Sequence, residues 1–345
     1  MRAIMQRQAG GPEELVLDEV ETPQPGPGEV RIRVAASGVN RADILQRQGF
    51  YPPPKGITQI LGLEVAGVVD AVGPVLDRPA PKAHPGPSST SAWKDSRTTP
   101  KPGTPVVALL AGGGYAEYAI VPVGQCAPVP ASMSMVEAAA IMETAATVVS
   151  NFDHIHVAAG ETILIHGGTG GIGSFAIPYA KHLGLRVITT VGSPDNAAYA
   201  EKRGADLAVD YHGDWPDQVK AATDGNGVDA ILDIIGAKYL EDNVRLLARG
   251  GRMTVIGLQG GTKGTLDLNR LLTKAATITA TSLRFRPESE KTAIVRQVTE
   301  QIWPLFESGA IPLPPITEYP LAQAGDAHRL LESGKNQGKI VLTSM

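Results

Sequence analysis

A glycine-rich stretch is the first segment whose residue types and spacing could do chemistry. Gly168, Gly170 and Gly173 satisfy the pattern G-x-G-x-x-G, directly after the apolar run 163–165 and at the start of a helix expected over residues 172–182. Between a strand and a helix, such glycines let backbone N–H groups at the helix N-terminus hold a pyrophosphate. The sequence therefore predicts a dinucleotide-binding loop. A turn that only lets helix and strand approach is the alternative.

The end of the next expected strand, residues 185–191, bears on which dinucleotide is bound. An Asp or Glu at this place accepts hydrogen bonds from the ribose of NAD and repels a 2′-phosphate. The strand instead leads into Gly192 and Ser193, which favours NADPH. Against this, no Lys or Arg follows until Lys202, and Asp195 stands close by, so NADH remains open.

The usual devices for stabilising charge on a substrate oxygen are missing. One cysteine, Cys126, cannot serve a cysteine-rich zinc site. Tyr51 and Lys55 have the spacing of a Tyr-x-x-x-Lys acid, but the three prolines between them forbid the helix it needs. Hydride transfer to a quinone gives a phenolate, whose conjugate acid has a pKa of about 10. Hydride transfer to a ketone gives an alkoxide, whose conjugate acid has a pKa of about 16. Because that gap is worth roughly 8 kcal/mol of stabilisation, quinones and conjugated enones are the expected acceptors.

The elements around the glycine loop alternate between strand and helix. Apolar runs of strand length lie at 162–166, 185–191, 207–209, 230–235, 253–258 and 277–282. Six strands in βα alternation predict an α/β fold with a doubly wound parallel sheet.

The first third of the chain has a different pattern. Val30, Ile32 and Val34 alternate with Arg31 and Arg33, which is the period of a half-buried strand. A compact β-rich domain is expected there.

Length and charge narrow the class of protein. A chain of 345 residues is expected to form about two domains. Its 31 basic and 35 acidic residues give a net charge of −4, which argues against nucleic-acid or anionic-membrane binding and favours a small-molecule partner. The first residues lack the apolar segment of a leader, so a cytoplasmic protein is expected. Residues 75–103 are rich in proline and are interpreted as a loop insertion of open role.

Five motifs together resemble one known superfamily. They are Gly11-Pro12-Glu13, Gly38-Val39-Asn40-Arg41-Ala42-Asp43, Leu61-Gly62-Leu63-Glu64-Val65-Ala66-Gly67, Gly113-Gly114-Tyr115-Ala116-Glu117-Tyr118 and the loop 166–173. They resemble the medium-chain dehydrogenases/reductases and, within them, the zinc-independent NADPH:quinone oxidoreductases of the zeta-crystallin type. The resemblance covers the chain except for the insertion. Leu63 stands where zinc-dependent relatives place a histidine ligand, so no metal is expected.

This resemblance implies a domain organisation and an assembly. A GroES-like catalytic domain would occupy residues 1–126, a Rossmann domain 127–285, and residues 286–345 would return to the catalytic domain. Members of the family are usually homodimers or homotetramers.

The resemblance also implies the site residues. Asn40 and Tyr51 match the polar pair that would bind the quinone oxygen beside the nicotinamide. The positions that match cofactor-binding residues are Thr147, Gly168, Thr169, Gly170, Gly171, Ile172, Gly173, Gly192, Ser193, Asn196, Tyr211, Gly236, Gly257, Leu258, Ser282, Leu283, Arg284, Asn336 and Lys339. Asn196 replaces the lysine that the family places by the 2′-phosphate, which leaves the strictness for NADPH over NADH open.

The resulting hypothesis is an oxidoreductase that transfers hydride from NADPH to a quinone, with protons from solvent or a Tyr hydroxyl. Reduction of the double bond of α,β-unsaturated carbonyls is one alternative. A nucleotide-binding protein with little turnover is another.

Overall fold

The computed structural model describes residues 1–74 and 99–344, in two compact units. Unit 1 comprises Met1–Ala146, Leu283–Gly309 and Pro315–Met345, and unit 2 comprises Thr147–Ser282 and Ala310–Pro314. Helix α3 (Met142–His154) contains the boundary between them. Most of the expected insertion, residues 75–98, lies outside the described residues.

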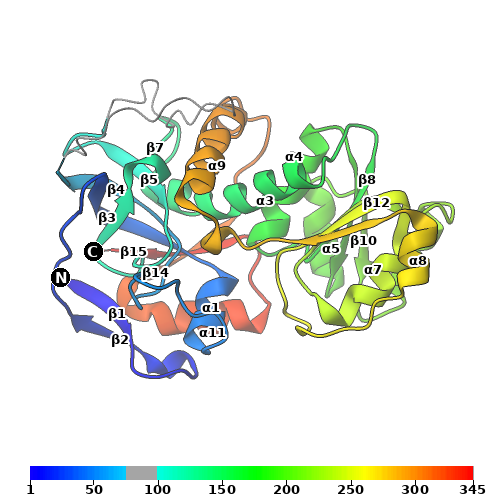
Figure 1. Cartoon of the computed structure of the whole chain (residues 1–345), viewed down its shortest axis with the longest axis horizontal. Helices are drawn as coiled ribbons and strands as arrows, with labels where there is room; N and C mark the ends of the chain where they lie inside the picture. Colours follow the sequence, from blue (N-terminus) through cyan, green and yellow to red (C-terminus); the bar gives the residue numbers. More distant parts are fainter. Residues whose placement is uncertain (75–98, 345) are drawn as a thin grey trace. The chain divides into compact units, whose positions relative to one another are not determined.

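Unit 1 is built on a seven-stranded sheet with the order β14-β15-β3-β4-β5-β7, in which β6 also pairs with β3. The strands are β3 (Glu29–Val39), β4 (Glu64–Val72), β5 (Pro105–Leu109), β6 (Tyr118–Pro122), β7 (Cys126–Pro128), β14 (Ile316–Pro320) and β15 (Lys339–Thr343). Unit 1 also contains a hairpin of β1 (Arg2–Gln6) and β2 (Leu15–Glu19). Its α-helices are α1 (Arg41–Arg47), α2 (Met135–Ala139), α9 (Glu288–Gln301), α10 (Trp303–Glu307) and α11 (Ala324–Ser333). Strand β15 pairs antiparallel with β3, so a late segment of the chain completes a sheet that begins in its first part (Figure 1).

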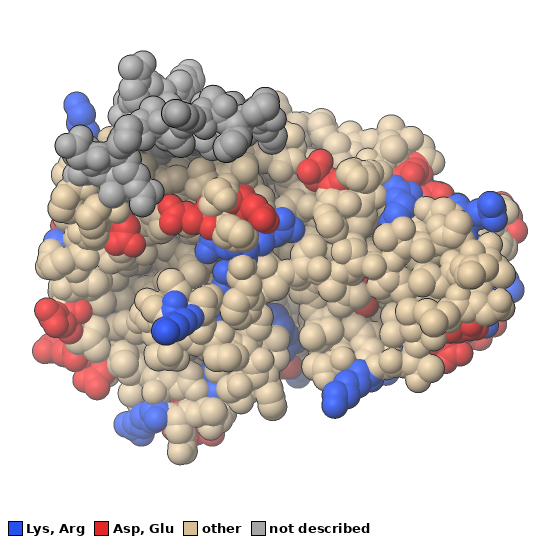
Figure 2. Space-filling model, in the orientation of Figure 1, with Lys and Arg blue, Asp and Glu red and all other residues tan. Residues whose placement is uncertain are grey.

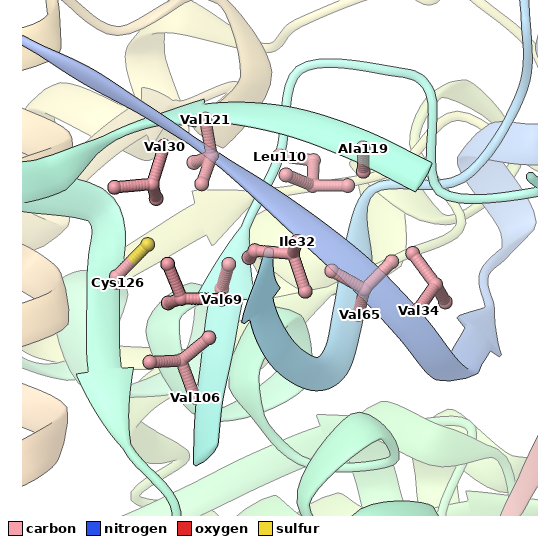
Figure 3. Close-up of a cluster of buried hydrophobic side chains, with 11 residues drawn as sticks. Val30, Ile32, Val34, Val65, Val69, Val106, Leu110, Ala119, Val121 and Cys126 are labelled. Carbon is pink, nitrogen blue, oxygen red and sulfur yellow. The ribbon is translucent and has the colours of Figure 1, made fainter. Parts of the chain in front are cut away.

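The alternation in β3 places its apolar side chains in the core of unit 1. In Figure 3, Val30 and Ile32 belong to one buried cluster with Val69 of β4, Val106 of β5 and Cys126 of β7. The Cys126 thiol is completely buried, and this burial raises its pKa well above the ordinary value. Cys126 is therefore a small apolar core residue and not a nucleophile.

Unit 2 is a six-stranded parallel sheet with the order β10-β9-β8-β11-β12-β13. Its strands are β8 (Thr162–His166), β9 (Arg186–Val191), β10 (Leu207–Asp210), β11 (Val228–Asp233), β12 (Leu247–Val255) and β13 (Thr277–Ala280). Its helices are α4 (Gly171–His182), α5 (Pro194–Lys202), α6 (Trp215–Ala222), α7 (Leu240–Leu246) and α8 (Leu268–Lys274). The predicted doubly wound sheet is confirmed, and its strand order reverses beside β8, where such sheets bind ligands.

Three strands end earlier than the sequence predicts. We expected a strand to Ile235, but β11 ends at Asp233 because the Asp233 carboxylate accepts the backbone N–H groups of Ile235 (2.7 Å) and Gly236 (3.0 Å). These bonds turn the chain out of the sheet. Likewise β12 ends at Val255 and not at Leu258, and β13 ends at Ala280 and not at Ser282.

The lengths of the helices and the distribution of surface charge bear on membrane and nucleic-acid binding. In the described part of the chain, no helix is both long and apolar enough to cross a membrane. On the face drawn in Figure 2, acidic and basic side chains are interspersed among neutral ones, so the described surface in that view carries no continuous basic field.

Candidate functional site

The glycine loop joins β8 to α4 in unit 2, and its glycines meet different surroundings. A Cβ at Gly173 would lie 2.6 Å from the backbone of Gly168, so only glycine fits there. A Cβ at Gly170 would meet nothing within 4 Å. The helix thus packs tightly on the strand through Gly173, while the space above Gly170 is open. This is the cradle that a pyrophosphate requires at a helix N-terminus.

A buried histidine supports the start of this loop. His166 Nε2 lies 2.7 Å from Asn243 Oδ1 and Nδ1 lies 3.1 Å from Thr190 Oγ1. Because an amide oxygen only accepts, Nε2 carries the proton and Nδ1 accepts from Thr190. Thr190 Oγ1 in turn accepts the Gly167 N–H (3.2 Å). Burial lowers the pKa of His166 to about 4, so the imidazole is neutral at physiological pH and serves structure.

The residues expected at the adenosine phosphate lie together at the ends of β9 and β10. Gly192 packs on Tyr211, because a Cβ at Gly192 would lie 2.8 Å from the Tyr211 ring carbon Cζ. Ser193 Oγ accepts the Asn196 N–H (3.2 Å) and so caps α5. The structure therefore brings these four residues to one corner of unit 2.

The loops after β11 and β12 adjoin each other. Ile256 N–H donates to Asp233 O (2.8 Å), and Ala237 N–H donates to Gly261 O (3.1 Å). Gly236, Gly257 and the half-exposed Leu258 lie in these two loops. Thr147 is buried in α3, where its carbonyl accepts from Asn151, and Ser282 is exposed after β13.

Asn40 is held by three polar groups in unit 1. It precedes α1, and its backbone N–H donates to Asp43 Oδ2 (2.8 Å). Its side-chain Nδ2 donates to Glu64 Oε1 (2.9 Å), and Lys339 Nζ donates to its Oδ1 (2.6 Å). Lys339 Nζ also donates to Glu64 Oε1 (2.7 Å), with both side chains almost completely buried. We refer to Asn40, Glu64 and Lys339 as the buried triad.

Tyr51 and Arg284 form a second group in unit 1. The Arg284 guanidinium carbon lies 5.4 Å from the Tyr51 ring centroid, Nη1 donates to Tyr51 O (3.2 Å) and Nε donates to Ala111 O (2.7 Å). The Phe285 ring stands edge-on to Tyr51, with centroids 5.3 Å apart. Burial lowers the pKa of Arg284. Its position was expected to contact cofactor, and within unit 1 it supports Tyr51.

Asp43 connects a further buried group that the sequence did not reveal. Its carboxylate accepts from Gly62 N (3.0 Å) and Tyr115 Oη (3.2 Å), and Tyr115 Oη lies 3.1 Å from His328 Nε2. Burial raises the pKa of Asp43 to about 6 and lowers that of His328 to about 3. The motif Asn40-Arg41-Ala42-Asp43 contained the signal, since an Asp three residues after an N-cap reaches back to it.

Two more of the predicted site residues, Asn336 and Leu283, lie in unit 1. Asn336 is half-buried and its Nδ2 donates to Gly338 O (3.3 Å); Leu283 is half-buried as well. Among the described residues, no group of three or more His, Cys, Asp or Glu side chains could hold a metal ion.

Comparison with known proteins gives a match along the chain. Residues 26–131 match the family described as the alcohol dehydrogenase GroES-like domain, and residues 171–299 match the zinc-binding dehydrogenases. The structure of a mycobacterial quinone oxidoreductase is similar with 32% identity and a TM-score of 0.81, covering 99% of both chains. An Escherichia coli quinone oxidoreductase complexed with NADPH is similar with 28% identity and a TM-score of 0.83, over 99% of this chain and 100% of that one.

Curated relatives include much longer proteins. The phthioceranic/hydroxyphthioceranic acid synthase of Mycobacterium tuberculosis is 31% identical over 325 residues, which is 92% of this chain and 14% of the relative. The chain thus spans about one seventh of the length of these first curated relatives. The two matching families, the parallel sheet with its glycine loop and the full-length structural likeness show that the chain belongs to the medium-chain dehydrogenase/reductase superfamily.

Proposed function

We propose that the protein reduces quinones with NADPH by direct hydride transfer and without zinc. The observation that carries this proposal is the likeness to quinone oxidoreductases over the whole length of both chains, joined to a glycine loop that fits a pyrophosphate. When bound, NADPH supplies the hydride. Gly168 to Gly173 would hold the pyrophosphate, and Gly192, Ser193 and Tyr211 the adenosine phosphate.

The substrate half of the proposal rests on Asn40 and Tyr51. The Asn40 amide would donate to the quinone oxygen as negative charge develops on it, and Tyr51 would orient the ring or supply a proton. A phenolate requires less stabilisation than an alkoxide, so hydrogen-bond donors can suffice. Asn196 supplies no positive charge for a 2′-phosphate at the adenosine corner, so NADH is proposed as an additional donor.

The residues present do not fit a catalytic zinc ion, although one matching family is described as zinc-binding. Leu63, at the place of a histidine ligand, is buried in the core of unit 1, and Cys126 lies in the same unit's sheet core. An aliphatic side chain and a buried thiol offer no open tetrahedral site. The proposed hydride transfer therefore needs no metal, and activity is expected to survive chelators.

Reduction of α,β-unsaturated carbonyls is the second candidate. It requires the same hydride transfer to a conjugated acceptor, with negative charge developing on a conjugated oxygen that the same donors would stabilise. The two candidates differ only in the acceptor.

The test is an acceptor competition. Purified protein is mixed with NADPH or NADH and with either a simple quinone or a conjugated enal, and the absorbance of the reduced cofactor is followed with and without a chelator. Chelator-resistant NADPH oxidation that is faster with the quinone supports the proposal, and a preference for the enal selects the second candidate. Cofactor binding without turnover on either would indicate a nucleotide-binding protein and contradict both.

A further inference from the structure

A buried cation lies directly against the amide that we assign to the substrate. Lys339 begins β15 and is 3% exposed, and its Nζ contacts two atoms of the buried triad, Asn40 Oδ1 (2.6 Å) and Glu64 Oε1 (2.7 Å). Glu64 is held from its other side, because Oε2 accepts the Glu143 N–H (2.8 Å). The charges of Lys339 and Glu64 compensate each other, as a buried pair requires.

These contacts determine which way the Asn40 amide points. An ammonium group only donates and a carboxylate only accepts, so the atom facing Lys339 must be Oδ1 and the atom on Glu64 must be Nδ2. Glu64 takes one of the two Nδ2 hydrogens. Within residues 1–74 and 99–344, Glu64 is the acceptor recorded for Nδ2, which leaves its second N–H for another acceptor.

We propose that Lys339 is a positioning residue that fixes and polarises the Asn40 amide, so that its second N–H donates to the oxygen of the quinone during hydride transfer. This rests on the proposed function. A cation on the carbonyl oxygen of an amide withdraws electron density from its nitrogen, which makes the N–H a stronger donor; chains of hydrogen bonds reinforce one another in this way. The buried ammonium would thus act on the substrate oxygen through Asn40, without touching it.

The position of Lys339 also distinguishes this role from direct cofactor contact. Its ammonium has two acceptors inside unit 1 and almost no exposed surface. Removing the ammonium should therefore leave NADPH affinity intact while weakening the donor to the quinone.

The experiment compares Lys339→Arg, Lys339→Met and the double variant Lys339→Met/Glu64→Gln. The double variant removes both charges, so it keeps no unpaired buried ion if the single variant fails to fold. Arg31→Met is the control: Arg31 of β3 pairs with Asp70 (2.6 Å) on β4, the strand that also carries Glu64, and it lies nine residues from Asn40.

The readouts are kcat and KM for a series of quinones whose phenolates differ in basicity, and the Kd for NADPH by calorimetry. We expect the double variant to lose about 10- to 100-fold in kcat, with the largest loss for the most basic phenolates and an unchanged Kd for NADPH. Lys339→Arg keeps the positive charge and should retain most of the wild-type kcat. Arg31→Met should keep the full wild-type kcat.

Three results would overturn the inference. They are a double variant as fast as wild type, a loss that is the same for every quinone, and a raised Kd for NADPH. If the wild-type protein itself turned over no quinone, the proposed function would fail first and the inference with it.

Discussion

At the scale of single residues, one residue type serves opposite purposes in the glycine loop. Gly173 is required by the fold, since a Cβ there would meet backbone at 2.6 Å. Gly170 is not required by the fold, because a Cβ there would meet only open space and its φ of −73° suits any residue. The open position is the one that a bound pyrophosphate would fill.

A pair of alanine variants separates the two purposes. Gly170→Ala should leave the free energy of unfolding within about 0.5 kcal/mol of wild type yet weaken NADPH binding at least about 10-fold, or about 1.4 kcal/mol. Gly173→Ala should lower the unfolding free energy by about 1–3 kcal/mol, because packed backbone must move. Denaturant titration and calorimetry measure the two quantities. Tight NADPH binding by Gly170→Ala would contradict the cradle.

Single residues also mark the limit of sequence reasoning about the site. Asn40 was identified from a motif, but its partners Glu64 and Lys339 were not assigned to it. Glu64 and Lys339 are 275 residues apart in sequence and meet only because β15 returns to β3. A charge inside a core cannot be told from a surface charge until its neighbours are known, so the ion pair could not be predicted.

At the scale of elements, the buried histidine at the end of β8 makes the stability of unit 2 depend on pH. The unfolded chain binds a proton at His166 below pH of about 6.5, whereas the folded chain binds it only near a pKa of about 4. Between these values acid favours the unfolded state, so stability falls as the pH falls through this window. At about pH 5 the loss from this group is about 2 kcal/mol.

The corresponding variant is His166→Gln, which stays neutral at every pH. Its unfolding free energy should change about 2 kcal/mol less than that of wild type between about pH 7.5 and about pH 5. Trp215 fluorescence can follow urea unfolding, since its ring lies edge-on to His166 at 5.1 Å. His182→Gln, on the exposed face of α4, should keep the wild-type pH dependence. An equal pH dependence in His166→Gln and wild type would refute the assignment.

The elements themselves were largely predictable. Apolar runs between glycine turns located all six strands of unit 2, because buried parallel strands read as continuous apolar runs. Their ends were not predictable where side chains intervene: Asp233 ends β11 by capturing two N–H groups of its own chain. An aspartate in an apolar run could equally well have been a surface residue.

At the scale of the whole molecule, unit 1 is assembled from both ends of the chain. β15 lies between β14 and β3 and supplies Ile340, Val341 and Leu342, none more than 1% exposed. Two of these side chains pack with Ile4 and Val39 from the first part of the chain. Unit 2 has its own core under its parallel sheet. The two units are therefore expected to differ in their dependence on the last residues of the chain.

Truncation after Gly338 tests this dependence. It removes three buried side chains worth about 1.5–3 kcal/mol each, which together approach the 5–15 kcal/mol of a typical domain, and it leaves Glu64 without its cation. Unit 1 should fail to fold while unit 2 keeps its core.

Tryptophan fluorescence can follow the two units separately. Trp303 lies in unit 1 and Trp215 in unit 2, and both are 4% exposed. Each can be followed as the sole tryptophan, with the others replaced by phenylalanine. Truncation should shift the emission of Trp303 to that of a solvated indole and leave that of Trp215 unchanged. A buried Trp303 in the truncated chain would mean that β15 only covers a sheet that forms without it.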